Sequence, residues 1–309
     1  MRAADLIVKA LEAEGLQRVY CVPGESYLAL LDALHDSTVK TIVCRHESGA
    51  GFMAVAEAKM TGKPALFMVS RGPGATNGSI AVHVAEQDAV PLVLLIGQVS
   101  REERLRGAFQ EVDYEQFFGG MAKGVFEVAD GAKMAEIITR AFRLAASGVP
   151  GPVIIALPED MLEDECDGAL PPPYPRPVVR FAPEDATLVQ TLIDKAERPI
   201  LIAGGLFRGQ TGADALARFA EAQRIPVAVS WKNQDCFDNA SPLYAGHLGV
   251  GNPPALRQKL NESDLVIAAG TRLGDIGTLN YQFPRAPVPL QSLVHIYPDA
   301  APIGKVIRP

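Results

Sequence analysis

One carboxylate in this sequence stands where an apolar segment gives way to a helix of small residues. Glu47 lies in the stretch RHESGAGFMAVAEAKMTGKP, residues 45–64, directly after the β-branched segment VKTIVC at 39–44. The residues that follow it are mostly Ala, Gly, Met and Phe, and Gly62 and Pro64 mark a helix end. This pattern predicts that Glu47 is buried at a strand-to-helix junction, where a carboxyl could move protons.

Two interpretations of Glu47 are open at this point. It could be a first-turn carboxylate that the helix dipole stabilises. It could instead be an acid–base group that its apolar neighbours Val43, Phe52 and Met53 shield from water. We expect His46 beside it to pack or to hydrogen-bond rather than to act as a base.

Two further loops could face the same ligand. SRGPGATNG (70–78) and CVPGESY (21–27) each follow an apolar segment, and in a parallel sheet ligands bind at the carboxyl ends of strands. The first loop departs from the dinucleotide fingerprint GxGxxG, because Asn77 stands at the place of the third glycine. It could also be a simple turn capped by Asn and Thr. Three loops that converge on one sheet edge nevertheless favour a ligand site.

Alternating strands and helices must position these loops. In the first half we expect strands at 19–22, 40–44, 65–70, 91–97 and 152–157, and helices at 4–14, 25–34, 49–60, 76–86 and 132–146. The segment 101–118 reads as a polar lid or interface loop. The predicted fold class is α/β, with Rossmann-like parallel sheets that carry helices on both faces.

Composition changes in a proline-rich stretch from 163 to 185, with prolines at 171, 172, 173, 175, 177 and 183. We therefore expect a first domain at 1–165, a Pro-rich linker at 166–186 and a second domain at 187–309. The second domain restarts the alternation, with helices at 187–195 and 213–223 and strands at 199–205, 225–230, 264–270 and 293–297. It looks cut short, because the sequence stops soon after its last strand.

Composition and charge limit the function classes. A length of 309 residues with 48% hydrophobic residues fits two compact domains, and a net charge of -7 with scattered Lys and Arg argues against nucleic acid or an anionic membrane. The cysteines (Cys21, Cys44, Cys166 and Cys236) lie far apart without a CxxC pair, which favours a reduced, cytoplasmic setting over zinc or disulfides. The N-terminus predicts an amphipathic helix rather than a signal peptide, and no segment is long enough to span a bilayer.

Six segments together resemble a known family. They are PGESYLALLDAL, RHESGAGFMA, SRGPGATN, VPLVLLIGQV, AFQEVD and SGVPGPVIIALPED, in this order. These segments are similar to the amino-terminal half of thiamine-diphosphate-dependent enzymes of the acetolactate (acetohydroxyacid) synthase group, and IAGG, AGHLGVG and AGTRLGD extend the similarity more loosely. The resemblance implies a domain that binds the pyrimidine ring of the cofactor, followed by a Rossmann-like central domain.

The resemblance also implies a set of site residues. The family's glutamate matches Glu47, which would hydrogen-bond the pyrimidine nitrogen N1′ and promote the tautomer that deprotonates the thiazolium ring. The matched positions are Glu47 and Gln110 for catalysis; Pro23, Gly24, Glu47, Pro73 and Asn77 for the cofactor; and Phe109 and Lys123 for the substrate, with no metal ligand.

The implied reaction is the decarboxylation of a 2-oxo acid such as pyruvate, followed by attack of the enamine on a second carbonyl compound, with Mg²⁺ as a further cofactor. Two departures stand out. Val149 replaces an arginine that contacts FAD in the synthases, so FAD is only a possible cofactor. The family's third domain, which anchors Mg²⁺ and the diphosphate, is absent from these residues, so we expect this chain alone to be inactive.

Family sites form between subunits, so a homodimer or homotetramer is expected. The alternative is a non-catalytic two-domain scaffold for nucleotide binding or for pairing with another subunit. A nicotinamide dehydrogenase is disfavoured because the fingerprint is missing.

Overall fold

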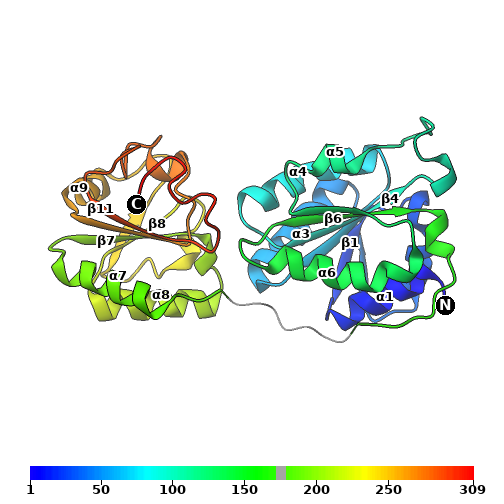
Figure 1. Cartoon of the computed structure of the whole chain (residues 1–309), viewed down its shortest axis with the longest axis horizontal. Coiled ribbons are helices and arrows are strands. Elements are labelled where there is room, and N and C mark those ends of the chain that lie inside the picture. The colour runs from blue at the N-terminus through cyan, green and yellow to red at the C-terminus, as the bar shows by residue number, and fades with distance from the viewer. Residues whose placement is uncertain (172–178) are drawn as a thin grey trace. The chain divides into compact units, whose positions relative to one another are not determined.

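The computed structural model describes residues 1–171 and 179–309, and the chain forms two compact units, 1–177 and 178–309 (Figure 1). Both units are α/β with entirely parallel sheets, which confirms the predicted fold class. The part of the predicted linker at 172–178 lies outside the described residues, and a helix already begins at Pro183 within the predicted linker range. The limits 1–165 and 187–309 stay predictions.

The first unit contains a six-stranded sheet in the order β2-β1-β3-β4-β6-β5. In chain order its strands and α-helices are α1 (Ala3–Ala13), β1 (Arg18–Cys21), α2 (Leu28–His35), β2 (Lys40–Val43), α3 (Glu47–Thr61), β3 (Ala65–Val69), α4 (Pro73–Gln87), β4 (Leu92–Gln98), α5 (Tyr114–Phe118), β5 (Gly124–Glu127), α6 (Met134–Ala146) and β6 (Pro152–Pro158).

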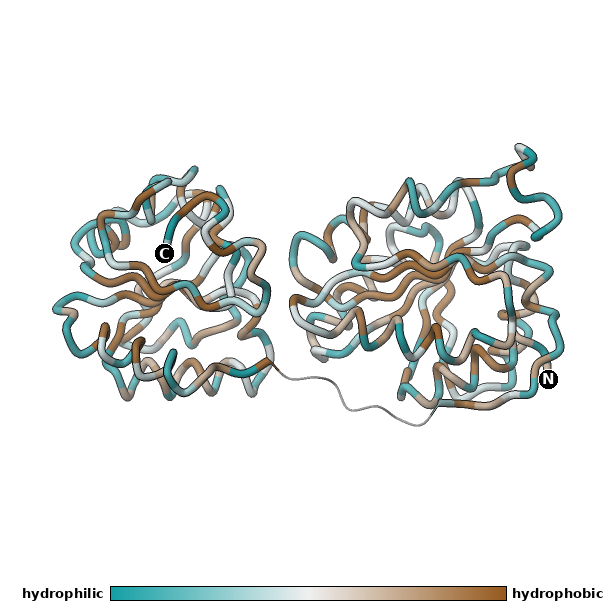
Figure 2. The backbone as a smooth tube through the Cα atoms, viewed as in Figure 1, coloured by the Kyte–Doolittle hydropathy of each residue, from teal (hydrophilic) through white to brown (hydrophobic). Residues whose placement is uncertain are grey.

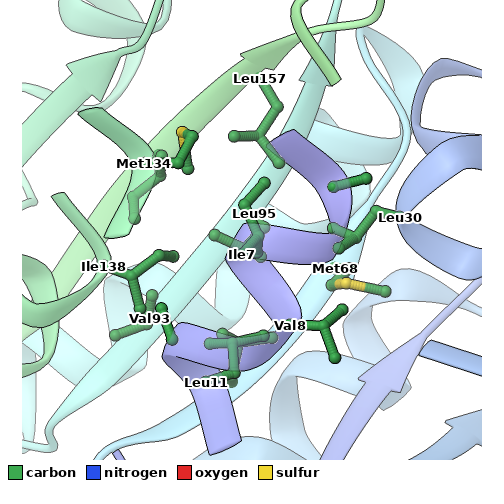
Figure 3. Close-up of a cluster of buried hydrophobic side chains, with 14 of the residues drawn as sticks. Ile7, Val8, Leu11, Leu30, Met68, Val93, Leu95, Met134, Ile138 and Leu157 are labelled. Carbon is green, nitrogen blue, oxygen red and sulfur yellow. The ribbon is translucent and has the colours of Figure 1, made fainter. Parts of the chain in front are cut away.

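Helices cover both faces of this sheet because its central strands are apolar on both sides. Along β3, Leu66 and Met68 face one layer while Phe67 and Val69 face the other, as the period of two requires. The first layer packs against α1, α2 and α6, and Figure 3 shows Ile7, Leu30 and Ile138 meeting Met68 and Leu95 there. The second layer packs against the small residues of α3 and α4. The two cores hold the carboxyl ends of the strands in fixed register.

Two parts of the first unit differ from the sequence expectation. The predicted helix at 25–34 begins as a separate 3₁₀ turn, Glu25–Tyr27, before α2. The predicted polar loop at 101–118 contains α5, and the short strand β5 follows it. The helix α5 and the strand β5 are too short for a periodic pattern to predict, and β5 forms because β6 offers it a free edge.

The second unit contains a five-stranded sheet in the order β11-β10-β7-β8-β9. In chain order its strands and α-helices are α7 (Pro183–Lys195), β7 (Pro199–Ala203), α8 (Gln210–Gln223), β8 (Val227–Val229), β9 (Tyr244–His247), α9 (Pro254–Glu262), β10 (Leu265–Ala269) and β11 (Ser292–Ile296). Figure 2 shows the strands of each unit as its most hydrophobic segments. Helices α7 and α8 cover one face of this sheet, and α9 covers the other.

The sequence patterns did not predict β9 and α9. The strand β9 contains Gly246 in a left-handed conformation, and α9 is short and rich in polar residues. In the described part of the chain, no helix has the length and apolar character needed to cross a membrane.

Candidate active site

The first sheet has a topological switch point between β1 and β3. The chain moves outward from β1 to β2 and then returns to place β3 on the other side of β1. In α/β sheets, ligands bind at such a point, in the crevice between the loops that leave the carboxyl ends of the two strands, here β1 and β3. Gly24 lets these two loops touch, because a Cβ at this position would lie 2.6 Å from Cβ of Ser70. The three loops that the sequence singled out all lie at this edge.

Glu47 is the first residue of α3, at the end of the loop that follows β2. His46 caps the helix, and its Nδ1 accepts a hydrogen bond of 3.1 Å from the backbone N–H of Ser48, as expected for a hydrogen-bonding histidine. The amide of Asn77 donates to Oε2 of Glu47 at 3.0 Å, and the Ser48 hydroxyl donates to the Asn77 carbonyl at 2.8 Å. Helices α3 and α4 are thus joined at their N-terminal ends around one carboxylate.

The second oxygen of this carboxylate is available to a ligand. In residues 1–171 and 179–309, Oε1 of Glu47 makes no hydrogen bond, and it lies 3.6 Å from the position that a Cβ on Gly74 would take. Gly74 is the second residue of α4, so the space above the start of that helix is kept free of side chains. The carboxyl is held through one oxygen and presented through the other.

The predicted shielding of Glu47 is not formed within this chain. Glu47 is only partly buried, and the three side chains expected to cover it are exposed by 64% for Val43, 41% for Phe52 and 45% for Met53. The sequence-based expectation of a buried carboxyl was therefore wrong for the chain by itself. The reason is that α3 turns its smallest residues, among them Ala50 and Ala54, towards the sheet, which leaves its large side chains outside.

The loop that contains Phe109 and Gln110 is folded around one acidic side chain. Glu111 accepts hydrogen bonds from the backbone N–H groups of Leu105, Gly107 and Ala108, and it pairs with Arg104. The backbone bond from Leu105 is the largest cause that holds the pKa of Glu111 below its usual value. A single carboxylate therefore fixes the shape of this loop.

This fixed loop reaches the switch point through Gln110. A Cβ on Gly72 would lie 2.8 Å from Cβ of Gln110, and both residues have positive φ, 58° and 64°. Gln110 is thus packed against the residue that caps α4, while the Phe109 side chain is 78% exposed. The structure therefore brings Gln110 to the segment between β3 and α4, the helix that contains Asn77. The exposed side chain of Phe109 could contact a ligand.

Lys123 is not brought together with these residues. It directly precedes β5, at the amino ends of the parallel strands, whereas Glu47 lies at the carboxyl ends. Its ammonium donates to the backbone carbonyls of Ser147 and Val149. Within the first unit, Lys123 and Glu47 are on opposite edges of the sheet.

Pro23 and Pro73 form the rim of the crevice. Both are exposed, Pro23 after β1 and Pro73 at the first position of α4, where a missing N–H costs nothing. The structure therefore brings Pro23, Gly24, Glu47, Pro73, Asn77 and Gln110 to one edge of the sheet.

Sequence reasoning missed the residues that support the crevice from below. Ser26 is fully buried, shares a hydrogen bond of 2.9 Å with the hydroxyl of Ser70, and accepts one from the backbone N–H of Arg71. Arg71 pairs with Glu159 at 2.6 Å and with Glu25 at 3.5 Å. These contacts join the ends of β1, β3 and β6. The one sequence signal that could have indicated these contacts is Arg71, the charged residue inside the loop SRGPGATNG.

Two buried tyrosines close the same region. The hydroxyl of Tyr114 accepts a hydrogen bond of 3.1 Å from the N–H of Gly72, and burial raises its pKa to about 12. The Tyr27 hydroxyl donates to the Val22 carbonyl, and burial, followed by the nearby Cys21 and Glu47, raises its pKa as well. Both hydroxyls therefore stay protonated and serve as fixed supports of the loops.

Comparison with known proteins now identifies the domains. Residues 1–117 match the N-terminal TPP binding domain of thiamine pyrophosphate enzymes, and residues 187–309 match the central domain of the same enzymes. The first match contains every residue found at the switch point. The chain belongs to the thiamine pyrophosphate enzyme family. Thiamine pyrophosphate is another name for thiamine diphosphate, so the resemblance in the sequence is confirmed.

Several curated relatives of this chain are acetolactate synthases. A probable acetolactate synthase large subunit of Methanocaldococcus jannaschii is 34% identical over 317 residues, which include 100% of this chain and 53% of the relative. The large subunits of acetolactate synthase isozymes 1 and 2 of Escherichia coli K12 are 35% and 33% identical, over 54% and 55% of their lengths. The chain spans about half the length of the curated relatives it matches.

Proposed function

We propose that this chain is part of a thiamine-diphosphate-dependent enzyme that decarboxylates a 2-oxo acid such as pyruvate and joins the product to a second carbonyl compound. The observation that carries this proposal is the carboxyl of Glu47, which Asn77 holds through Oε2 at the switch point while Oε1 has no partner in the described residues. A carboxylate that served only its own helix would bond the N–H groups of that helix. This one is bonded across to α4, which weighs against the alternative of a non-catalytic scaffold.

The residues at this edge fit the pyrimidine end of the cofactor. A flat ring with nitrogen donors and acceptors needs one free carboxylate oxygen and a rim without bulky side chains. Oε1 of Glu47 offers the first, and Gly74 near the start of α4 keeps a side chain away from that oxygen. Pro23 and Pro73 would contact the faces or edges of the ring. This part of the site would therefore bind the ring by shape and by one strong hydrogen bond.

When bound, the cofactor supplies the carbon nucleophile and the electron sink that 2-oxo acid decarboxylation requires. Glu47 would share a proton with a ring nitrogen through Oε1. Asn77 would keep the carboxyl in the orientation that this exchange needs, because it fixes Oε2. Gln110 and Phe109, on the loop that Glu111 organises, would contact the substrate. Lys123 would join them only in a larger site than this unit assembles.

The family resemblance implies two further cofactors, Mg²⁺ and FAD. Mg²⁺ would accompany the diphosphate, and within the described ranges no three His, Cys, Asp or Glu side chains are grouped so that they could hold a metal ion. FAD would have to enter the switch point of the second sheet, between β7 and β10. There the Leu206 N–H bonds the Gly270 carbonyl at 3.4 Å, and a Cβ on Gly204 would lie 2.1 Å from that oxygen. The loops touch at this point, and Val149 stands where the synthases have the arginine that contacts FAD, so we do not propose FAD and derive no step through it.

A second copy of the chain is the proposed partner. Helix α3 exposes Phe52, Met53 and Met60, the last by 85%, and α4 exposes Ile80 by 49%. Helices α3 and α4 lie on the same face of the sheet, so these side chains form an uncovered apolar surface beside Glu47. A partner on this surface would supply the missing shielding of the carboxyl. A protein that sediments as a monomer at micromolar concentration would contradict this part of the proposal.

The role of Glu47 is tested with the Glu47→Gln variant and a matched control, Glu136→Gln, which changes an exposed glutamate of α6. The variants are made in the complete enzyme that contains this chain, because the chain alone is expected to be inactive. We expect Glu47→Gln to keep its circular dichroism spectrum and to lower thiamine-diphosphate-dependent release of CO₂ from pyruvate by roughly 10²-fold or more. It should also slow hydrogen–deuterium exchange at C2 of the cofactor. Unchanged exchange and turnover in Glu47→Gln would rule out the assigned role, and Glu136→Gln should behave like the unmodified protein.

A further inference from the structure

The second unit contains a cavity that the proposed function does not use. Its volume is about 450 Å³, and it lies between α9 and the loop 276–283. The lining residues are Gly249, Val250, Arg257, Leu260, Asn261, Ile276, Leu279, Asn280, Gln282 and Phe283. Five of these residues, from 276 to 283, belong to the long segment that follows β10, and none belongs to the loop that follows β7. Its size is within the range of small-molecule sites, roughly 300–1,000 Å³.

Four polar side chains line this cavity. Arg257 and Asn261 are four residues apart on α9 and therefore share one face of the helix. Asn280 and Gln282 come from the opposite wall. In the part of the chain that the structure describes, none of the four side chains makes a hydrogen bond, and Arg257 has no ion pair. A cation and three carboxamides are therefore available to one ligand.

The charge of the cavity has one sign. Arg257 is the only charged residue among those that line it, and the lining includes no Asp or Glu. The floor is apolar, since Leu260 and Phe283 are exposed by only 1% and 4% and belong to the core of this unit. A ligand would therefore meet a guanidinium and amides on its sides and an apolar surface beneath it.

The loop that forms the second wall is held in an uncommon conformation. Leu279, Asn280 and Tyr281 are consecutive and have φ values of 56°, 56° and 61°, a left-handed region that costs a non-glycine residue of the order of 1 kcal/mol. Thr278, which is fully buried, fixes the loop: its hydroxyl accepts from the Tyr281 N–H at 3.1 Å and its carbonyl from the Phe283 N–H at 2.9 Å. The strained loop is thus rigid, and it presents Asn280 and Gln282 towards α9 before any ligand arrives.

We propose that this cavity binds a small organic anion, with a carboxylate or phosphate group on Arg257 and an apolar body over Leu260 and Phe283. A guanidinium is the donor that suits both anions, because its N–H groups match two anion oxygens at once. The carboxamides of Asn261, Asn280 and Gln282 would bond the polar edge of the body, since each can donate and accept. This site is independent of the Glu47 site and does not rest on the function proposed above.

The test follows the methyl groups of Leu260, Ile276 and Leu279 by NMR during titration, with Ile193 and Leu216 on the other face of the sheet as internal references. The probes are benzoate and adenosine monophosphate, each added to about 10 mM, together with their neutral counterparts benzamide and adenosine and with inorganic phosphate. We expect saturable shifts of the cavity methyls with at least one organic anion. Benzoate alone would assign a carboxylate site, and adenosine monophosphate alone would assign a phosphate site.

Two variants and one control complete the test. Arg257→Gln should weaken binding of the effective anion about ten-fold or more, because a charge-assisted hydrogen bond is lost. Asn280→Gly keeps the positive φ and removes the carboxamide, so binding should weaken while the fold is retained. Arg218→Gln removes a charge from an exposed position of α8 and should leave binding unchanged. The proposal is overturned if neither organic anion shifts the cavity methyls, if neutral probes or inorganic phosphate bind equally well, or if Arg257→Gln binds like the unmodified protein.

Discussion

The buried contacts that support the crevice depend on one glycine of the central strand β4. A Cβ on Gly97 would lie 2.0 Å from Oγ, 2.5 Å from Cβ and 2.7 Å from the carbonyl oxygen of Ser26. Real Cβ atoms do not approach other atoms so closely, so Gly97→Ala must push the 3₁₀ turn Glu25–Tyr27 away from the strand. Overpacking of a buried site costs about 1–3 kcal/mol, and three such contacts place this variant at the upper end. With an m-value of roughly 2 kcal/mol/M in urea, the unfolding midpoint of the first unit should fall by about 1.5 M.

The chain offers an internal reference for this measurement. Trp231 is the only tryptophan and belongs to the second unit, so its fluorescence reports unfolding of that unit, while circular dichroism reports both. We expect Gly97→Ala to lower the unfolding midpoint of the first unit, which circular dichroism reports. The midpoint of the second unit, which Trp231 fluorescence reports, should stay unchanged. Gly120→Ala is the matched control, because nothing lies within 4 Å of its added Cβ, and it should stay within about 0.5 kcal/mol.

A double-mutant cycle identifies the cause. In the Ser26→Gly background two of the three close contacts are removed, so the cost of Gly97→Ala should fall by at least about 1 kcal/mol. An unchanged midpoint in Gly97→Ala, or an equal cost with and without the Ser26 side chain, would refute this account of how the strand supports the crevice.

Two further outcomes follow from the ion pairs and the pKa shifts. Arg71→Met should destabilise the first unit by about 2 kcal/mol in urea titration, because it leaves the Glu159 carboxylate without its 2.6 Å partner. Glu25→Gln should cost little, because the Glu25 side chain is 70% exposed. An equal loss of stability in both variants would contradict this assignment. Partial burial alone would raise the pKa of Asp264, but hydrogen bonds from the backbone N–H groups of residues 197 and 198 outweigh it and hold the pKa below the usual value. This stabilisation is therefore complete above the pKa of the unfolded chain, about 4, and is lost as the pH falls towards the lower folded value; Trp231 fluorescence should show a shallower acid dependence in Asp264→Asn.

The sequence determined a large part of the fold by itself. Runs such as ALFMV in β3 and LVLLIGQ in β4 are apolar on both faces, and only a parallel sheet between two helical layers buries both faces. The loops after β1, β2 and β3 contain the glycines, prolines and polar residues of the crevice, so the edge of the sheet and the position of Glu47 on it were predictable. The family resemblance rested on these same loops.

Only the tertiary structure decided how Glu47 is held and what surrounds it. The bond from Asn77 joins residues 30 positions apart, and the supports Ser26, Arg71 and Glu159 come from three different strand ends. No local pattern encodes such pairs, because they depend on strand order rather than on spacing. The burial of Glu47 was mispredicted for a related reason: periodicity predicts a helix, but which of its faces meets the sheet and which stays open is settled by packing. The same holds for the cavity beside α9, where four polar side chains meet only because a strained loop folds back against that helix.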